Sequence, residues 1–97
     1  PSANFTYNYF DGNSALLVTM DEGDKFPAGE LLLSNGNVNV TWAAVANTNN
    51  TTRVKPGDTI RLSQGNAFGR SVTSTDEISI YWTGGNKTRK LDEWTDS

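Results

Sequence analysis

The sequence predicts an all-β protein, an antiparallel β-sandwich of immunoglobulin-like type with about seven short strands. Segments in which apolar and polar residues alternate recur along the whole chain, and this alternation is typical of strands with one buried face. Turn signals rich in Gly, Pro and Asn separate the segments at intervals of roughly ten residues. No segment keeps a helical period long enough for an ordinary helix. A small barrel is the alternative arrangement of the same strands.

Length and composition restrict the classes of protein. The 97 residues suit a single sandwich domain over positions 1–97. The chain has no cysteine and no histidine, so it lacks disulfides, the commonest general base and the commonest transition-metal ligand. A net charge of −3 with scattered Lys and Arg argues against a nucleic-acid partner. No apolar run is long enough to span a membrane, and no signal peptide is visible.

The first strands form a predicted hairpin over residues 3–20. In "ANFTYNYF", Phe5 and Tyr7 share a face with Tyr9, and polar residues alternate with them. "DGN" is a turn signal, since Gly and Asn tolerate positive φ, and "ALLVTM" is the second strand. The polar, punctuated segment "DEGDKFPAGE" is expected to be a loop.

The middle of the chain is expected to contain the strands "LLLS" and "VNVTW", separated by an "NG" turn. In the second of these strands Val38, Val40 and Trp42 share a face, which turns Asn39 outward. The polar segment "NTNNTT" at residues 47–52 should remain a mobile, accessible loop, because it buries nothing apolar. "KPGD" predicts a type II turn with Gly57 at positive φ.

The last strands are expected at "EISIYWT" and "KTRKLDEW", with a "GGN" turn between them. Trp94 lies near the end of the chain, on the face of its strand opposite to that of Leu91, and is expected to be partly exposed. Period-two alternation defines the predicted core, which consists of Phe5, Tyr7, Val18, Val38, Val40, Trp42, Ile60, Leu62, Ile78, Ile80 and Trp82.

Catalysis is not predicted. Ser–His–Asp and Cys–His arrangements need residues that the chain lacks. Acidic residues cluster in two segments of the sequence, one with Asp21, Glu22 and Asp24 and the other with Asp92, Glu93 and Asp96. Either cluster could supply a carboxylate pair of the glycosidase kind or a weak calcium site. Acidic residues in loops and near a terminus are usually solvated, however, which argues against both uses. We therefore expect no catalytic residue, no cofactor and no tightly bound metal.

Five asparagines stand in the N-x-Ser/Thr pattern of N-glycan acceptors, each with Thr in the third position. They are Asn4, Asn39, Asn49, Asn50 and Asn86. A chain rich in Asn and Thr also produces such matches by chance. The two acceptors in predicted strands fall on polar faces, however, and the other three fall in predicted loops or turns. N-glycosylation is therefore a specific expectation, above all for Asn39 and one of the adjacent pair Asn49 and Asn50.

Two further interpretations concern aromatic and lysine residues. The tryptophans and the aromatics of residues 5–9 would suit either a sandwich core or a sugar-binding surface, and core is the commoner use of such side chains. An adhesin-type Lys–Asn isopeptide bond would need Lys25 or Lys55 to be buried beside Asn and a carboxylate. Both lysines lie in predicted loops, which argues against that bond.

The order of the segments "MDEGDKFPAGEL", "KPGDTI", "ISIYWTGGNK" and "LDEW" resembles the head domain of archaeal type IV pilins. These motifs are turn chemistry and strand patterns, and the resemblance covers nearly the whole chain. It implies an extracellular, cell-surface role in adhesion or attachment, with N-linked glycans on the outside.

In that family a long apolar N-terminal helix mediates self-association into a filament. This chain shows no such helix, so the resemblance implies that residue 1 lies at or after the junction with it, in a processed or trimmed chain. Related archaellum stator proteins instead anchor to the surface layer. A surface-layer-binding or carbohydrate-binding module of an extracellular protein is therefore the alternative.

Overall fold

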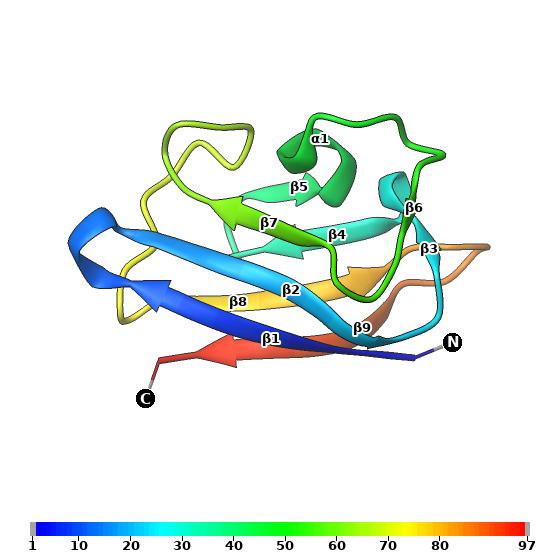
Figure 1. Cartoon of the computed structure of the whole chain (residues 1–97), viewed down its shortest axis with the longest axis horizontal. Coiled ribbons are helices and arrows are strands. Elements are labelled where there is room, and N and C mark those ends of the chain that lie inside the picture. Colours follow the sequence, from blue (N-terminus) through cyan, green and yellow to red (C-terminus); the bar gives the residue numbers. More distant parts are fainter. Residues whose placement is uncertain (1, 97) are drawn as a thin grey trace.

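In the computed structural model, which describes residues 2–96, the chain is a sandwich of two antiparallel sheets (Figure 1). The prediction of an all-β antiparallel sandwich is confirmed, and the sheets do not close into a barrel. One sheet has the order β1 (Ala3–Phe10), β2 (Ala15–Gly23), β7 (Thr59–Leu62), and the other has the order β5 (Asn39–Thr41), β4 (Leu31–Ser34), β8 (Glu77–Trp82), β9 (Arg89–Thr95).

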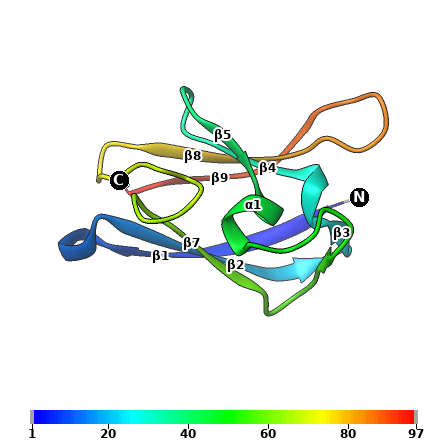
Figure 2. The ribbon, with the colours of Figure 1, turned by 90° about the horizontal axis from the view of Figure 1, so that it is seen from above.

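Short elements fill the connections between the sheets. β3 (Phe26–Pro27) pairs with β6 (Arg53–Val54), and two 3₁₀ turns, η1 (Asp11–Asn13) and η2 (Ala28–Glu30), precede β2 and β4. The one α-helix of the described residues is α1 (Trp42–Ala46), and Figure 2 shows it between the two layers. The chain crosses from one sheet to the other after β2, after β5 and after β7, as in Greek-key sandwiches.

The predicted hairpin of β1 and β2 is present, with two differences in detail. The left-handed residue of its turn is Ser14, at φ 50°, and not a residue of "DGN". The backbone N–H of Ser14 donates to the carbonyl of Asp11, which closes the turn. β2 also continues to Gly23, which pairs with Ala3, so the expectation that residues 21–23 form a loop was wrong. Pairing with the start of β1 gives the backbone N–H and C=O groups of this segment hydrogen-bond partners.

The prediction that the strand at "VNVTW" extends through Trp42 was wrong. β5 stops at Thr41, and Trp42 is the first residue of α1. The Thr41 hydroxyl accepts a hydrogen bond from the Ala44 N–H at 3.1 Å, so it acts as the N-cap of the helix. Three alanines follow Trp42 in α1, and alanine has the highest helix propensity. Two-residue alternation misses this change because Trp42 points inward in either geometry.

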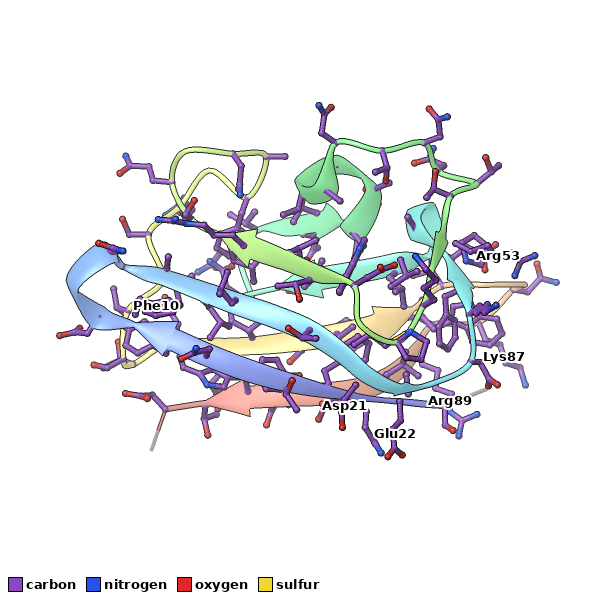
Figure 3. The ribbon with its side chains drawn as sticks, in the orientation of Figure 1. Phe10, Asp21, Glu22, Arg53, Lys87 and Arg89 are labelled. Atoms are coloured by element: carbon purple, nitrogen blue, oxygen red, sulfur yellow. The ribbon has the colours of Figure 1, made fainter. Side chains whose placement is uncertain are left out.

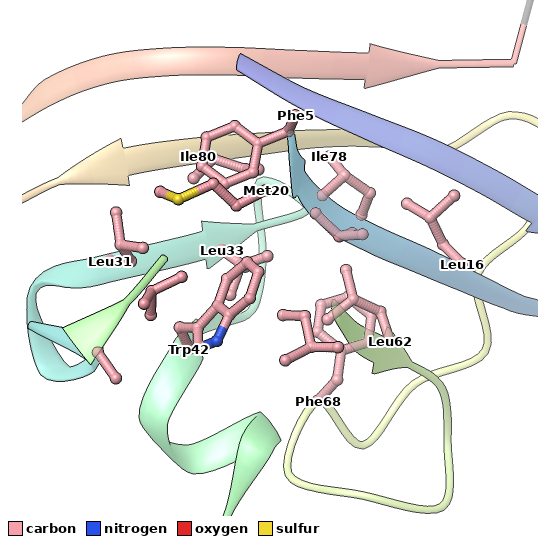
Figure 4. Packing of buried hydrophobic residues seen from close by; sticks show 14 of the residues in the cluster. Phe5, Leu16, Met20, Leu31, Leu33, Trp42, Leu62, Phe68, Ile78 and Ile80 are labelled. Carbon is pink, nitrogen blue, oxygen red and sulfur yellow. The ribbon is translucent and has the colours of Figure 1, made fainter. Parts of the chain in front are cut away.

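The core confirms most of the predicted interior (Figure 4). The predicted residues that are buried are Phe5, Val18, Trp42, Ile60, Leu62, Ile78 and Ile80. The predicted residues that are only half-buried are Tyr7, Val38, Val40 and Trp82. The core also contains residues that were not predicted, among them Leu16, Met20, Phe26, Leu31, Leu33, Val54, Phe68 and Val72.

Position in the sheets explains two of the half-buried residues, Val40 and Trp82. β5 is an edge strand, so Val40 has a neighbouring strand on one side only. Trp82 ends β8, where its indole N–H reaches Glu30 Oε1 at 2.9 Å. Trp94 differs in the opposite direction: it was expected to be partly exposed, yet it is only 8% exposed and packs on Tyr9 with the ring centroids 5.4 Å apart.

We expect Trp42→Ala to lower the free energy of unfolding by about 3–5 kcal/mol, the usual range for removing a buried tryptophan. Trp42 is 3% exposed, and its ring centroid is 6.2 Å from that of Phe5 in the opposite sheet. Urea unfolding gives the measurement. Trp82→Ala is the matched control and should have a clearly smaller effect, because that indole is only half-buried. Equal losses in the two variants would contradict this description of the core.

Candidate functional site

The candidate glycan acceptors are exposed at all five positions, which are Asn4, Asn39, Asn49, Asn50 and Asn86. They do not converge on one place but are distributed over the surface. Asn4 lies on β1 and pairs with Glu22 of β2, and Asn39 starts β5 at the edge of the other sheet. Asn49 and Asn50 follow α1, and Asn86 lies in the turn between β8 and β9.

Asn39 is held by the β4–β5 hairpin. It pairs with Ser34, and the intervening turn is closed by the Asn35 side chain, whose Oδ1 accepts the N–H of Asn37 at 2.8 Å and of Val38 at 2.7 Å. The expectation that Asn39 faces solvent is confirmed. Thr41, the third residue of this acceptor pattern, is half-buried, and its hydroxyl caps α1.

The loop at residues 47–52 is exposed as expected, but backbone hydrogen bonds hold it in place, which the sequence did not predict. The N–H of Thr48 donates to Ala43 at 2.9 Å and ends α1. Two further bonds tie the loop to η2, because the carbonyls of Asn50 and Thr52 accept the N–H groups of Gly29 and Ala28. Hydrogen bonds, and not apolar burial, thus offset the ordering entropy.

Adjacent Asn49 and Asn50 have different surroundings. A Cβ placed on Gly29 would lie 2.6 Å from the Cβ of Asn50, so the Asn50 side chain occupies the space that glycine leaves open. Asn50 therefore packs against η2 at its base. Both residues are exposed, and the contact with η2 crowds the Asn50 side chain on one side.

Two shallow hollows flank this loop. One, of about 280 Å³, lies between α1 and the turn at residues 55–58. Its lining combines apolar and hydroxyl side chains, including Trp42, Ala46, Val54, Thr48, Thr52 and Thr59. The other, of about 350 Å³, is lined by Pro27, Gly29, Glu30, Asn50, Thr51 and Arg53. Trp42 is almost fully buried, so the first hollow presents little aromatic surface to a ligand.

The aromatic side chains pack with one another inside the sandwich and do not form an exposed platform. Phe5 contacts Trp42, Tyr9 contacts Trp94, and Phe26 contacts Trp82, with ring centroids 5.4–6.2 Å apart. Tyr7 is half-buried, and its hydroxyl has no hydrogen-bond partner among the described residues. Burial, followed by the charge of Asp92, raises the pKa of Tyr7 far above its usual range.

The acidic groups do not assemble into a metal site. No cluster of three or more metal-ligating side chains occurs in residues 2–96. Asp92 instead accepts the N–H groups of Phe5 and Glu93, and Asp24 accepts the N–H of Ser2. Glu93 forms an ion pair with Lys90, and this hydrogen-bonded partner lowers the pKa of the Glu93 carboxyl.

Neither lysine considered for an isopeptide bond is buried. Lys25 and Lys55 are both exposed, and Lys55 pairs with Asp58 at 3.2 Å across the turn. That turn is the predicted one, with Gly57 at φ 99° and the N–H of Asp58 bonded to the carbonyl of Lys55. Because such a bond requires a buried lysine, this arrangement argues against it.

Comparison with known proteins adds no relatives: no protein-family model and no curated protein matches the chain. Within residues 2–96, every helix is too short or too polar to cross a membrane.

We expect Gly29→Ala to lower the free energy of unfolding by about 1–3 kcal/mol, the usual range for overpacking. Gly29 does not have positive φ, so crowding against Asn50 is the physical cause. Gly12→Ala is the control, because nothing lies within 4 Å of its added Cβ and Gly12 also lacks positive φ. Urea unfolding of both variants tests this, and an unaffected Gly29→Ala variant would show that Asn50 is free to move away.

Proposed function

We propose that this chain is the head domain of an archaeal type IV pilus-like surface filament that serves adhesion or attachment. The observation that carries the proposal is the exposure of all five candidate acceptors around one compact sandwich. The order of motifs that resembles pilin heads supports it. The role is structural and not enzymatic, and its partners are N-linked glycans and other copies of the same protein.

The arrangement of the chain suits a head domain carried on an N-terminal helix. β1 starts at Ala3, at the end of the sandwich where the turn between β8 and β9 also lies (Figure 1). A helix preceding residue 1 would enter the domain at that end. Glycans on the outer faces and loops would then lie around the filament, where bulky polar sugars solubilise the surface and hinder proteases.

A surface-layer-binding or carbohydrate-binding module is the second candidate. The hollow beside α1 favours it, because hydroxyls of Thr48 and Thr52 surround an apolar floor, as in sites for small polar ligands. The shallow shape of this hollow and its lack of aromatic surface make it the weaker proposal.

The proposal is tested on cells of the source organism with antibodies against residues 1–97, visualised by gold labelling in electron microscopy. Label along thin filaments is the expected result, together with an apolar segment of about 20 residues upstream of the domain in the full-length protein. Label confined to the envelope surface would favour the surface-layer-binding alternative. Label confined to the cell interior would contradict both candidates.

We further expect N-linked glycans at Asn39 and at Asn49 in protein from native cells. Both side chains are exposed, and we expect Asn49 to be used before Asn50 because the Asn50 side chain packs over Gly29. Mass spectrometry of native peptides spanning residues 37–53 is the measurement. Fully unmodified Asn39, Asn49 and Asn50 would overturn this expectation, and a glycan on Asn50 alone would overturn the argument from crowding.

A further inference from the structure

The two ends of the long axis differ in charge and in apolar surface. At one end the β1–β2 turn, the start of β8 and the end of β9 come together (Figure 1), and Phe10 lies there (Figure 3). We call this the acidic end, and it consists of Phe10, Asp11, Asp76, Glu77 and Asp96. Phe10 is 40% exposed, and it is the one large hydrophobic residue exposed among residues 2–96. A protein contact typically has an apolar centre and a polar rim, and Phe10 with its acidic neighbours offers both.

Tyr9 contacts one of these carboxylates and lies within the electrostatic reach of two others. The single proton of its hydroxyl is shared between two acceptors, Asp11 Oδ1 and the carbonyl of Val72, each at 3.2 Å. Desolvation raises the pKa of Tyr9, and the negative charges of Asp11, Asp96 and Asp76 raise it further. No carboxylate of the acidic end forms an ion pair within the described residues. Arg70 is the single cation of the loop that leads into β8.

The opposite end, toward which Asp21 and Glu22 of β2 also lie, carries a basic hairpin, which we define as residues 83–90. It contains Lys87, Arg89 and Lys90 and no acidic residue. Lys90 is neutralised by Glu93, whereas Lys87 and Arg89 are exposed and form no ion pair within the described residues. Figures 1 and 2 show the turn projecting beyond the sheets, and Figure 3 shows Lys87 and Arg89 on it.

The base of the basic hairpin is fixed to the rest of the domain. The carbonyl of Glu30 accepts both the N–H and the hydroxyl of Thr83, and the Glu30 carboxylate accepts the Trp82 indole N–H. Gly84 is packed so closely on the Trp82 ring that an added Cβ would lie 2.3 Å from it. The two free cations therefore project from a defined position, which favours a specific contact over diffuse attraction.

We propose that the basic hairpin of one copy docks on the acidic end of a second copy, with Phe10 at the contact. The domain is 36 Å long, so the two surfaces of one molecule cannot meet, whereas copies stacked end to end bring them together. A contact between different patches of identical subunits builds an open chain. The contact deepens the proposed function, because it states how neighbouring heads in a filament touch.

Such a contact should be weak between free domains, since exposed ion pairs contribute little each and are screened by salt. In a filament the helices would hold the heads close together, and the resulting high effective concentration would favour contact without new interactions.

The contact also restricts modification of the basic hairpin. Asn86 lies within the basic hairpin, so a glycan there would block docking, and we expect Asn86 to be unmodified in assembled protein.

Site-directed crosslinking of the 97-residue chain tests the proposal, because the chain contains no cysteine. Asn13→Cys and Thr88→Cys place one thiol beside the acidic end and one on the basic hairpin, at exposed positions and without altering charge. A short bismaleimide should convert the double variant into a ladder of oligomers at low salt. Either single variant should give dimers at most, and high salt should abolish the ladder.

Charge reversals identify the contact. In the double-cysteine background, Lys87→Glu with Arg89→Glu should remove the ladder, and adding Asp11→Lys with Asp96→Lys should restore it. Lys55→Glu with Arg61→Glu causes the same change in net charge elsewhere and should leave the ladder intact. Circular dichroism confirms that each variant is folded. A ladder that is absent, or insensitive to the hairpin reversal, would overturn the contact.

The end-to-end contact and the proposed function can be contradicted independently of each other. An absent ladder would leave a filament assembled through an N-terminal helix in place. Gold label away from filaments would remove the proposed function but not an end-to-end contact measured on the isolated domain.

Discussion

Closure of the sandwich by Trp42 is the interaction on which most of the remaining structure depends. The strand β5 stops one residue earlier, Thr41 caps the new helix, and the indole enters the space between the sheets beside Leu33 (Figure 4). There it meets Phe5 from the other sheet. The end of α1 then directs the following loop onto η2, where backbone hydrogen bonds fix Asn49 and Asn50. One buried side chain therefore positions both the core and the acceptor loop.

The edges of the two sheets are protected against pairing with strands of another chain. β5 has only three residues, and α1 contacts β7 beside its free edge. β1 and β9 lie next to each other, and the Asp92 carboxylate accepts the Phe5 N–H that would otherwise be open at the edge of β1. Short or covered edges prevent strand-to-strand aggregation.

Alternation was sufficient to predict β8, which has a neighbouring strand on both sides. In β8, Ile78 and Ile80 are fully buried, as a period of two requires. Alternation failed where a cap or a long-range pairing decides the outcome. Thr41 turns a strand into a helix through one side-chain hydrogen bond, and residues 21–23 become strand because β1 lies opposite them. Neither effect has a periodic signature.

The candidate site was predicted in part. Exposure of Asn39 followed from the inward direction of its neighbours, and the three loop and turn acceptors followed from composition. Anchoring of the loop to η2 and the packing of Asn50 on Gly29 did not follow, because both join segments about twenty residues apart in sequence. The clustering of Asp11, Asp76 and Asp96 around Tyr9 was likewise invisible, since β1, the β7–β8 connection and the end of β9 meet only in the folded chain.

The central claim is that this sandwich is a glycan-bearing head domain repeated along a surface filament. A cryo-electron microscopy reconstruction of filaments from native cells tests it most directly. The account predicts one sandwich per subunit, additional density projecting from Asn39 and Asn49, and the basic hairpin of one subunit against Phe10 and Asp11 of the next. Filaments whose subunits lack this sandwich would contradict the account.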